Sequence, residues 1–268
     1  MVTSSFIHGL GHRLVLFILI ISGCLSMAAR DFVVVIDAGH GGHDSGCVGK
    51  VAKEKDITLD VACRLAKKIN SSAPGLKALL TRDTDRYLTL QQRADIANKA
   101  HGDLFISIHV NSVAKENPGR SRVSGASIYT LGLSKSKNNL NVAMRENSVM
   151  ELEDNYTVKY KGFDPSSTES YIIFELNQDA HMKESIRFAS LAQNHLVKDA
   201  GRADKGVRQD GFWVLWATGM PAVLVELDFI CNPTQENFLN SPEGREKCAN
   251  ALFAALREYH SSVSAINM

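Results

Sequence analysis

Short, strongly apolar runs alternate with amphipathic segments along most of this chain. The apolar runs are rich in β-branched and aliphatic residues and are bounded by glycine or polar loops, a pattern that predicts buried strands. The predicted strands cover residues 33–36, 76–81, 104–109, 126–131, 212–215 and 222–227.

Between these strands, apolar residues recur with the spacing of one helix face. Asp56 is expected to cap a helix whose apolar face carries Val61, Leu65 and Ile69. Further helices are predicted around residues 90–97, 184–197 and 242–256, with a basic turn at 202–208. Alternating strands and helices predict an α/β fold, a single domain with a mostly parallel central sheet flanked by helices.

The alternation breaks down over residues 134–171, just before the last predicted strands. Lysine, asparagine and acidic residues dominate there, and Pro165 marks irregular chain, although 141–153 has helical character. Long insertions are uncommon in a compact domain unless they have a function or are mobile. We therefore treat 134–171 as a candidate regulatory insertion.

The amino-terminal segment 1–28 differs from the rest of the chain. Its apolar run at 14–21 follows His8, His12 and Arg13 and precedes small residues, the pattern of a secretory signal. The run is short for a membrane span, which leaves an uncleaved anchor as the alternative. Cys24 ends a lipobox-like sequence, so simple cleavage and lipidation both remain open. Either route predicts an exported protein of the periplasm.

The composition disfavours some kinds of partner and site but indicates no particular function. Apolar residues make up 44% and charged residues 22% of the chain, as in ordinary globular proteins. A net charge of only +1 gives no argument for nucleic acid as a partner. The cysteines form no C-x-x-C pair, which disfavours a cysteine zinc site and makes free thiols the preferred interpretation over a disulfide.

Four residues stand where strands or their following loops end: His40, Glu54, His109 and Glu226. The carboxyl ends of parallel strands meet at one edge of a sheet, so these side chains are expected to converge. Glu226 ends the apolar run 222–225, where a buried carboxylate needs a cation or a proton partner. Two imidazoles and one carboxylate are a common ligand set for catalytic zinc, and a second carboxylate can take a proton from water.

Each residue also has an ordinary interpretation when taken alone. His40 and His109 resemble hydrogen-bonded core or loop histidines, and Glu54 lies among charges that water would solvate. His43, in the same glycine-rich loop, is disfavoured as a further ligand, and His101 is expected at the surface. The joint placement at strand ends is what favours a metal site.

Several ordered blocks of this sequence resemble the zinc-dependent N-acetylmuramoyl-L-alanine amidases of bacterial cell walls. The blocks are 36–42, 54–56, Arg93 with 97–98, 105–111 and 225–233. The resemblance implies an amidase catalytic domain over 32–260, zinc held by His40, Glu54 and His109, and Glu226 as the catalytic carboxylate. It also implies a peptidoglycan substrate, cleaved at the amide between N-acetylmuramic acid and L-alanine during cell-wall remodelling or daughter-cell separation.

The sequence departs from this family at three positions. Ala38 replaces a usual proline, Cys231 replaces a frequent serine, and Asp228 stands where glycine is usual. Asp228 matters most, because a second buried carboxylate would raise the pKa of Glu226.

The resemblance further implies that an activator protein moves a segment at this place off the zinc. The insertion and its flank carry carboxylates for such a contact: Glu146, Glu151, Glu153, Asp154, Glu169 and Glu175. The alternative is a solvated excursion that shapes a substrate groove.

Two other functions compete with this hypothesis. One is a hydrolase with a serine or cysteine nucleophile such as Cys47, although no G-x-S-x-G turn is present. The other is a non-catalytic murein-binding or activator module on an amidase scaffold, which the presence of all four key residues disfavours.

Overall fold

A six-stranded sheet in the order β2-β1-β3-β6-β4-β5 runs through the part of the chain that the structure describes. That part, in this computed structural model, comprises residues 30–132, 136–172, 174 and 181–266. The predicted signal segment, Cys24 and Glu175 lie outside it. The strands are β1 (Phe32–Ala38), β2 (Leu76–Leu80), β3 (Leu104–Asn111), β4 (Ala126–Leu131), β5 (Asp204–Asp210) and β6 (Ala222–Phe229).

Helices connect these strands and carry the apolar faces expected from the sequence. Among the described residues, no helix combines the length and apolarity needed to cross a membrane. The longer helices are α2 (Glu54–Ser72), α3 (Leu90–Lys99), α4 (Lys137–Asn147), α7 (Met182–Lys198), α9 (Pro233–Asn240) and α10 (Pro242–Ile266), and the short ones are η1 (Ser148–Leu152), α5 (Tyr156–Lys159), η2 (Thr168–Ile172) and α8 (Trp213–Trp216).

The sheet is mostly parallel, as predicted. Strand β1 pairs in parallel with β2 and β3, and β3 pairs in parallel with β6. Strand β4 reverses the direction because it pairs antiparallel with β6, while β5 is parallel to β4. The parallel block places the carboxyl ends of β1, β3 and β6 side by side at one edge.

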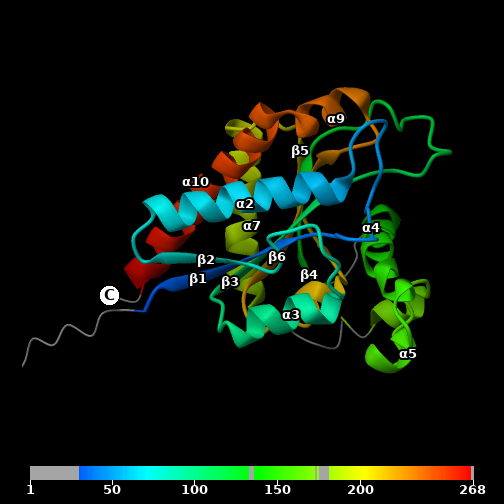
Figure 1. Cartoon of the computed structure of the whole chain (residues 1–268), viewed down its shortest axis with the longest axis horizontal. Coiled ribbons are helices and arrows are strands. Elements are labelled where there is room, and N and C mark those ends of the chain that lie inside the picture. The colour runs from blue at the N-terminus through cyan, green and yellow to red at the C-terminus, as the bar shows by residue number, and fades with distance from the viewer. Residues whose placement is uncertain (1–29, 133–135, 173, 175–180, 267–268) are drawn as a thin grey trace, which may run out of the picture. The chain divides into compact units, whose positions relative to one another are not determined.

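Two apolar layers cover the sheet on opposite faces. One contains Val34 and Ile36 of β1 with apolar residues of α2, α7 and α10. The other contains Val35 of β1 and Phe105 of β3, with α3, α8 and the insertion. Figure 1 shows α2 and α10 on one side of the sheet and α3 on the other. The alternation along β1 explains its continuous apolar sequence, since both faces are buried.

Three local predictions are wrong. The expected basic turn at 202–208 is largely the edge strand β5, whose polar, partly exposed sequence suits a sheet edge. The apolar run 212–215 belongs to helix α8, because a short apolar run does not distinguish a buried helix from a strand. Asp56 lies inside the first turn of α2, which Lys53 precedes.

The insertion forms a helical layer of its own beyond β4. Helix α4, η1, α5 and η2 follow one another there, drawn in green in Figure 1. Tyr160 and Phe163 pack their rings against Trp213 of α8, with centroids 5.0 and 5.4 Å away. The described residues of the segment 134–171 are therefore packed against the rest of the domain.

A buried ion pair fixes the end of β1. Arg93 of α3 donates to the Asp37 carboxylate at 2.8 Å and to the backbone carbonyls of Ala38 and His40 at 2.7 Å each. Arg93 and Asp37 are 2% and 1% exposed. Burial alone raises the pKa of Asp37, but the Arg93 charge and several hydrogen bonds hold it below its usual value.

Removing one partner of this pair should be costly. We expect Asp37→Ala to lower the free energy of unfolding by about 3–5 kcal/mol, because the Arg93 charge would remain buried without its partner. Urea titration measures the change. The pair Arg187–Glu184, at 3.6 Å and with about one third of each side chain exposed, supplies a control, and Arg187→Ala should cost less than about 1 kcal/mol. Equal losses in the two variants would contradict this account.

Candidate metal centre

Four side chains converge at the carboxyl edge of the sheet: His40, Glu54, His109 and Glu146. One ligand atom from each lies within 4.8 Å of the others. The Glu54 Oε1 atom is 3.2 Å from His40 Nε2 and 3.1 Å from His109 Nδ1. The Glu146 Oε2 atom is 3.2 and 3.0 Å from the same two nitrogens. Two imidazoles and two carboxylates thus face one point.

His40 owes its position to a constrained loop. Its backbone adopts a φ of 61°, a conformation that non-glycine residues rarely adopt. The Arg93 guanidinium holds its carbonyl, and Asp44 Oδ2 lies 2.7 Å from its Nδ1. The ring is thereby oriented with Nε2 toward the cluster, an arrangement common for metal-binding histidines.

Glu54 is fully buried, although its neighbours in the sequence are charged. It is the first residue of α2, and its two carboxylate oxygens accept from the backbone N–H groups of Val110 and Cys47, each at 2.7 Å. The helix start therefore presents this carboxylate to the loops that follow β1 and β3.

Strand register brings His109 and Glu226 together. His109 on β3 is paired with Glu226 on β6, and Ser127 of β4 is paired with Glu226 on its other side. Glu226 is fully buried and lies outside the four-residue cluster. Its Oε1 atom is 3.3 Å from Arg145 Nη2. The structure thus places all four residues singled out in the sequence at one edge.

The fourth member of the cluster comes from the insertion. Glu146, on helix α4, is 4% exposed, and its Oε1 atom pairs with Arg145 at 2.8 Å. Of the other acidic candidates, Glu153 is buried but accepts from the Tyr160 hydroxyl, and Glu151 is exposed. Glu146 is one of the six carboxylates that the sequence analysis offers for contact with the metal. No local sequence pattern distinguishes it from the other five.

The electrostatics of the cluster are dominated by burial and by mutual charge. Burial and the Glu146 charge raise the pKa of Glu226 to about 8, although Arg145 opposes them. Burial lowers the pKa of His109, but the charge of Glu146 and the hydrogen bonds with Glu146 and Glu54 together outweigh it and raise this pKa to about 9. The carboxylates therefore stabilise positive charge at this edge.

The donor set fits a divalent metal ion. The atoms His40 Nε2, Glu146 Oε2 and Glu226 Oε2 are buried and form no well-oriented hydrogen bond, although the first two lie 3.2 Å apart. Unpaired buried polar atoms are costly, and a cation at the centre of the cluster would satisfy the first two. Imidazole and carboxylate are ligands that zinc accepts.

Residues near the cluster resolve other questions from the sequence. His43 stacks on Tyr87, with centroids 4.1 Å apart, and is not part of the cluster. Asp228 is buried but binds Arg202 at 2.8 Å, so its charge has its own partner. Asp44, which orients His40, escaped the sequence analysis, although its i,i+4 position in the same loop was a usable signal. The four cysteines among the described residues are free.

The profile of the N-acetylmuramoyl-L-alanine amidases matches residues 34–258. The chain belongs to this family. The predicted family and α/β class are therefore confirmed.

Individual relatives agree with the family assignment. AmiC of Escherichia coli O6:H1, an N-acetylmuramoyl-L-alanine amidase, is 31% identical over 86% of this chain and 53% of its own length. The chain thus spans about half of that relative. AmiA of Escherichia coli K12, with the same activity in its name, is 32% identical over 85% of this chain and 75% of its own. The catalytic domain of CwlV from Bacillus (Paenibacillus) polymyxa superposes with a TM-score of 0.62 at 26% identity, covering 85% and 98% of the two chains.

A glycine next to the cluster offers a test of the metal geometry. A Cβ at Gly46 would lie 2.5 Å from the His40 ring and 2.6 Å from Glu54 Oε2. We expect Gly46→Ala to weaken zinc binding by about tenfold or more, because both ligands must shift, a loss of about 1.4 kcal/mol. Titration against a competing zinc chelator measures it.

Gly201 supplies a matched control. It has a similar φ of 68°, and a Cβ there meets nothing within 4 Å. Gly201→Ala should carry the same backbone strain and leave zinc affinity unchanged. Equal weakening in both variants would show that backbone strain, and not contact with the ligands, sets the affinity.

Proposed function

We propose that this protein is a zinc-dependent hydrolase of the amide bond between N-acetylmuramic acid and L-alanine in peptidoglycan. The convergence of His40, Glu54 and His109 beside the buried Glu226 carries the proposal. Family membership supplies the reaction class. Two imidazoles and one carboxylate would hold the metal, and a displaced Glu146 would leave a position for substrate.

The chain's own residues account for the proton transfers. When bound, zinc would make water nucleophilic near neutral pH and polarise the amide carbonyl. Displacement of Glu146 removes one of the causes that raise the pKa of Glu226. Glu226 then accepts one proton from the attacking water and returns it to the departing nitrogen of L-alanine as the carbon–nitrogen bond breaks. Its burial keeps the carboxylate away from competing water.

Two competing functions find less support. Burial and the Glu54 charge raise the pKa of the Cys47 thiol well above its usual range, the reverse of an activated nucleophile. A non-catalytic murein-binding module has no need of a fully buried, unpaired Glu226 oxygen beside a metal cluster.

The role of Glu226 is separable from metal binding. We expect Glu226→Gln to keep its zinc but to lose activity by about 10²–10⁴-fold, the usual contribution of a general base. Dye release from stained sacculi, with and without chelator, measures activity, and metal analysis measures zinc. His109→Ala should lose zinc as well as activity. Normal turnover by Glu226→Gln would exclude the assigned role.

We further propose that α4 holds the enzyme in an inhibited state. Glu146 occupies a ligand position, and Arg145 pairs with Glu226, so one helix engages both the metal site and the base. The cavity lined by His40, His109 and Glu146 measures only about 10 Å³, roughly the room for one water. An activator protein that displaces α4 would admit the substrate.

Removing the Glu146 carboxylate tests this inhibition. We expect Glu146→Ala to raise muropeptide release by roughly 5–150-fold, the range of a typical coupling free energy. Glu151→Ala, which removes an exposed carboxylate from the adjoining η1, is the control and should leave the rate unchanged. If Glu146→Ala releases no more product than the parent chain, α4 is only a wall of the substrate groove.

The cellular setting follows from the same proposal. Segment 1–28 would direct export, with Cys24 as the lipidation site if the lipobox is used, and the periplasm holds the peptidoglycan substrate. Cleavage there would serve wall remodelling or daughter-cell separation.

A further inference from the structure

Strand β6 carries an extra residue directly after Glu226. Glu226 is paired with His109 of β3. The next pair joins Phe229 to Asn111, so three steps along β6 match two steps along β3. A bulge of this kind bends its strand and changes the direction of nearby side chains, and bulges are frequent beside active sites. The backbone that follows Glu226 is therefore irregular at 227–228.

The side chain of Asp228 lies in this bulge. Asp228 is 1% exposed, and its Oδ1 atom accepts from the backbone N–H groups of Gly125 and Phe229, each at 2.8 Å. The regular pairing of β4 with β6 ends where Ser127 is paired with Glu226. Beyond that pair, the Asp228 carboxylate takes the place of a backbone oxygen and joins β4 to the bulged strand.

Arg202 holds the other oxygen of the same carboxylate. Arg202, in the turn between α7 and β5, donates to Asp228 Oδ2 at 2.8 Å and to Gln235 of α9 at 2.7 Å. Its guanidinium carbon lies 3.5 Å from the centroid of the Phe238 ring, also on α9. The Arg202 side chain is 10% exposed, so the ion pair is largely shielded from water. Asp228 and Arg202, here called the bulge clamp, thus connect β4, β6 and α9.

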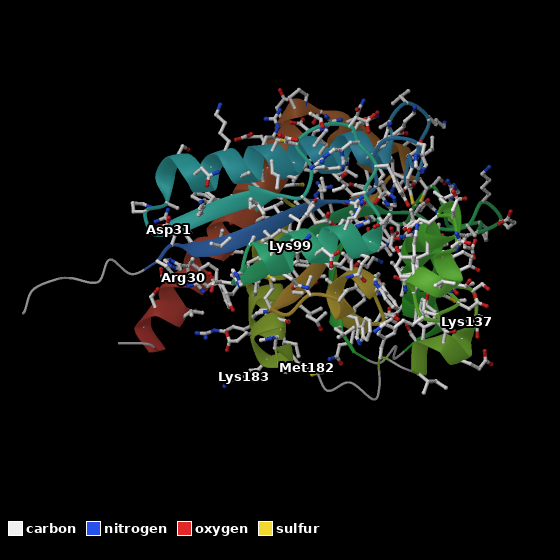
Figure 2. All side chains as sticks on the ribbon, turned by 60° about the horizontal axis from the view of Figure 1, so that its bottom comes forward. Arg30, Asp31, Lys99, Lys137, Met182 and Lys183 are labelled. Carbon is white, nitrogen blue, oxygen red and sulfur yellow. The ribbon has the colours of Figure 1, made fainter. Side chains whose placement is uncertain are left out.

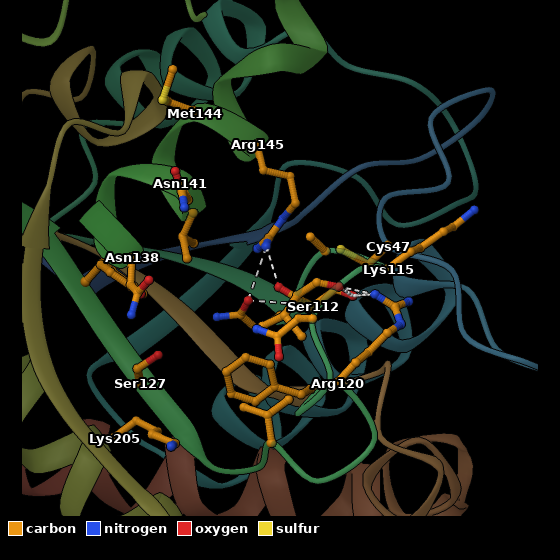
Figure 3. A pocket seen from close by; sticks show the side chains of 18 of the residues that line it. Cys47, Ser112, Lys115, Arg120, Ser127, Asn138, Asn141, Met144, Arg145 and Lys205 are labelled. Carbon is orange, nitrogen blue, oxygen red and sulfur yellow. Dashed lines mark hydrogen bonds between the residues drawn. The ribbon is translucent and has the colours of Figure 1, made fainter. Parts of the chain in front are cut away.

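Glu226 depends on its backbone for orientation. Its Oε2 atom has no hydrogen-bond partner among the described residues, and its Oε1 atom lies 3.3 Å from Arg145 Nη2. Arg145 belongs to α4, which begins at Lys137 on the outer side of the insertion layer (Figure 2). Figure 3 shows Arg145 reaching from this helix toward Ser112. A displacement of α4 therefore removes the contact that holds the Glu226 carboxylate.

We propose that Asp228, held by Arg202, is a positioning residue that keeps the Glu226 carboxylate directed into the site once α4 has moved. The bulge clamp fixes the backbone at 226–228 and so orients the side chain that this backbone carries. Asp228 itself takes no part in the proton transfers. The assignment of Glu226 as the base rests on the proposed function, whereas the restraint on the bulge does not. Glycine, which is usual at position 228, would permit a bulge but offers no side chain to hold it.

A role for Asp228 through its charge is the alternative. In an unbulged strand, residues 226 and 228 would share one face, and two buried carboxylates there would raise each other's pKa. The extra residue interrupts that alternation, and the Arg202 charge neutralises Asp228. Burial and the charge of Glu146 are the main causes that raise the pKa of Glu226. The contribution of Asp228 is therefore assigned to geometry.

Kinetics of the zinc-loaded full chain separate geometry from charge. Asp228→Ala should lower kcat for a soluble muropeptide by about 10–100-fold with little change in KM, because a small misplacement of a catalytic group costs about this much. The acidic limb of the pH–rate profile, where Glu226 takes up a proton, should stay in place. An unchanged kcat would overturn the proposal. A limb that moves to lower pH would also overturn it, because Asp228 would then act through its charge.

Two further variants identify the contacts that matter. Asp228→Asn keeps an oxygen for both N–H groups and should retain more of the rate than Asp228→Ala. Arg202→Gln should lower kcat, with Arg245→Gln as its matched control. Arg245 pairs with Asp60 at 3.0 Å, and its side chain is 16% exposed against 10% for Arg202. Arg245→Gln should leave kcat unchanged, and equal losses in the two arginine variants would contradict the proposal.

Amide hydrogen exchange reports on the bulge without turnover. In Asp228→Ala, exchange at Gly125 and Phe229 should become roughly tenfold faster or more, because each N–H loses a hydrogen bond to a charged acceptor. The amide of Glu226 should also exchange faster, whereas those of β1 should not. Unchanged exchange at these three amides would overturn the proposal even if kcat falls. A parent chain that cleaves no muropeptide would refute the proposed function alone, since exchange still decides whether Asp228 fixes the backbone of Glu226.

Discussion

The burial of carboxylates at one edge of the sheet is the constraint on which the rest of this structure depends. Glu54 and Glu226 are fully buried and Glu146 nearly so. Unpaired buried anions are too costly to keep, so the site must gather positive charge. Two imidazoles and Arg145 supply part of it, and a divalent cation would supply the rest. The fold is arranged around that requirement.

Buried polar interactions next to the sheet hold the site residues in place. The Asp37–Arg93 pair is buried between β1 and α3, and Arg93 also holds the carbonyl of His40 in its strained conformation. Arg82, fully buried as well, donates to the carbonyls of Ala38 and Gly39. Stability and ligand geometry therefore share the same residues, because both buried arginines bind carbonyls of the segment that carries His40.

The sequence predicted the positions of residues at strand ends, but it did not predict features that depend on tertiary contacts. His40, His109 and Glu226 could be placed because apolar strands that stop at polar residues define the edge of a parallel sheet. Strand β5 was missed because an edge strand need not be apolar. The contacts of Glu146 with His40 and His109 depend on how the insertion packs against the sheet edge. The spacing of apolar residues in the sequence does not predict that packing.

Helix α4 is built to be held by polar contacts more than by apolar burial. Its buried residues are Asn139, Val142, Ala143, Glu146 and Asn147, of which only two are apolar. An isolated helix of 11 residues is marginal in water, so α4 depends on its neighbours for order. Asn147 of α4 accepts from the backbone N–H of Trp213 and donates to the carbonyl of Gly211. Glu146 of α4 contacts His109 in the cluster. Polar contacts exchange readily for water or for a partner's groups, whereas buried apolar area does not. The helix that closes the metal centre is thus held in part by contacts that a partner's groups can replace.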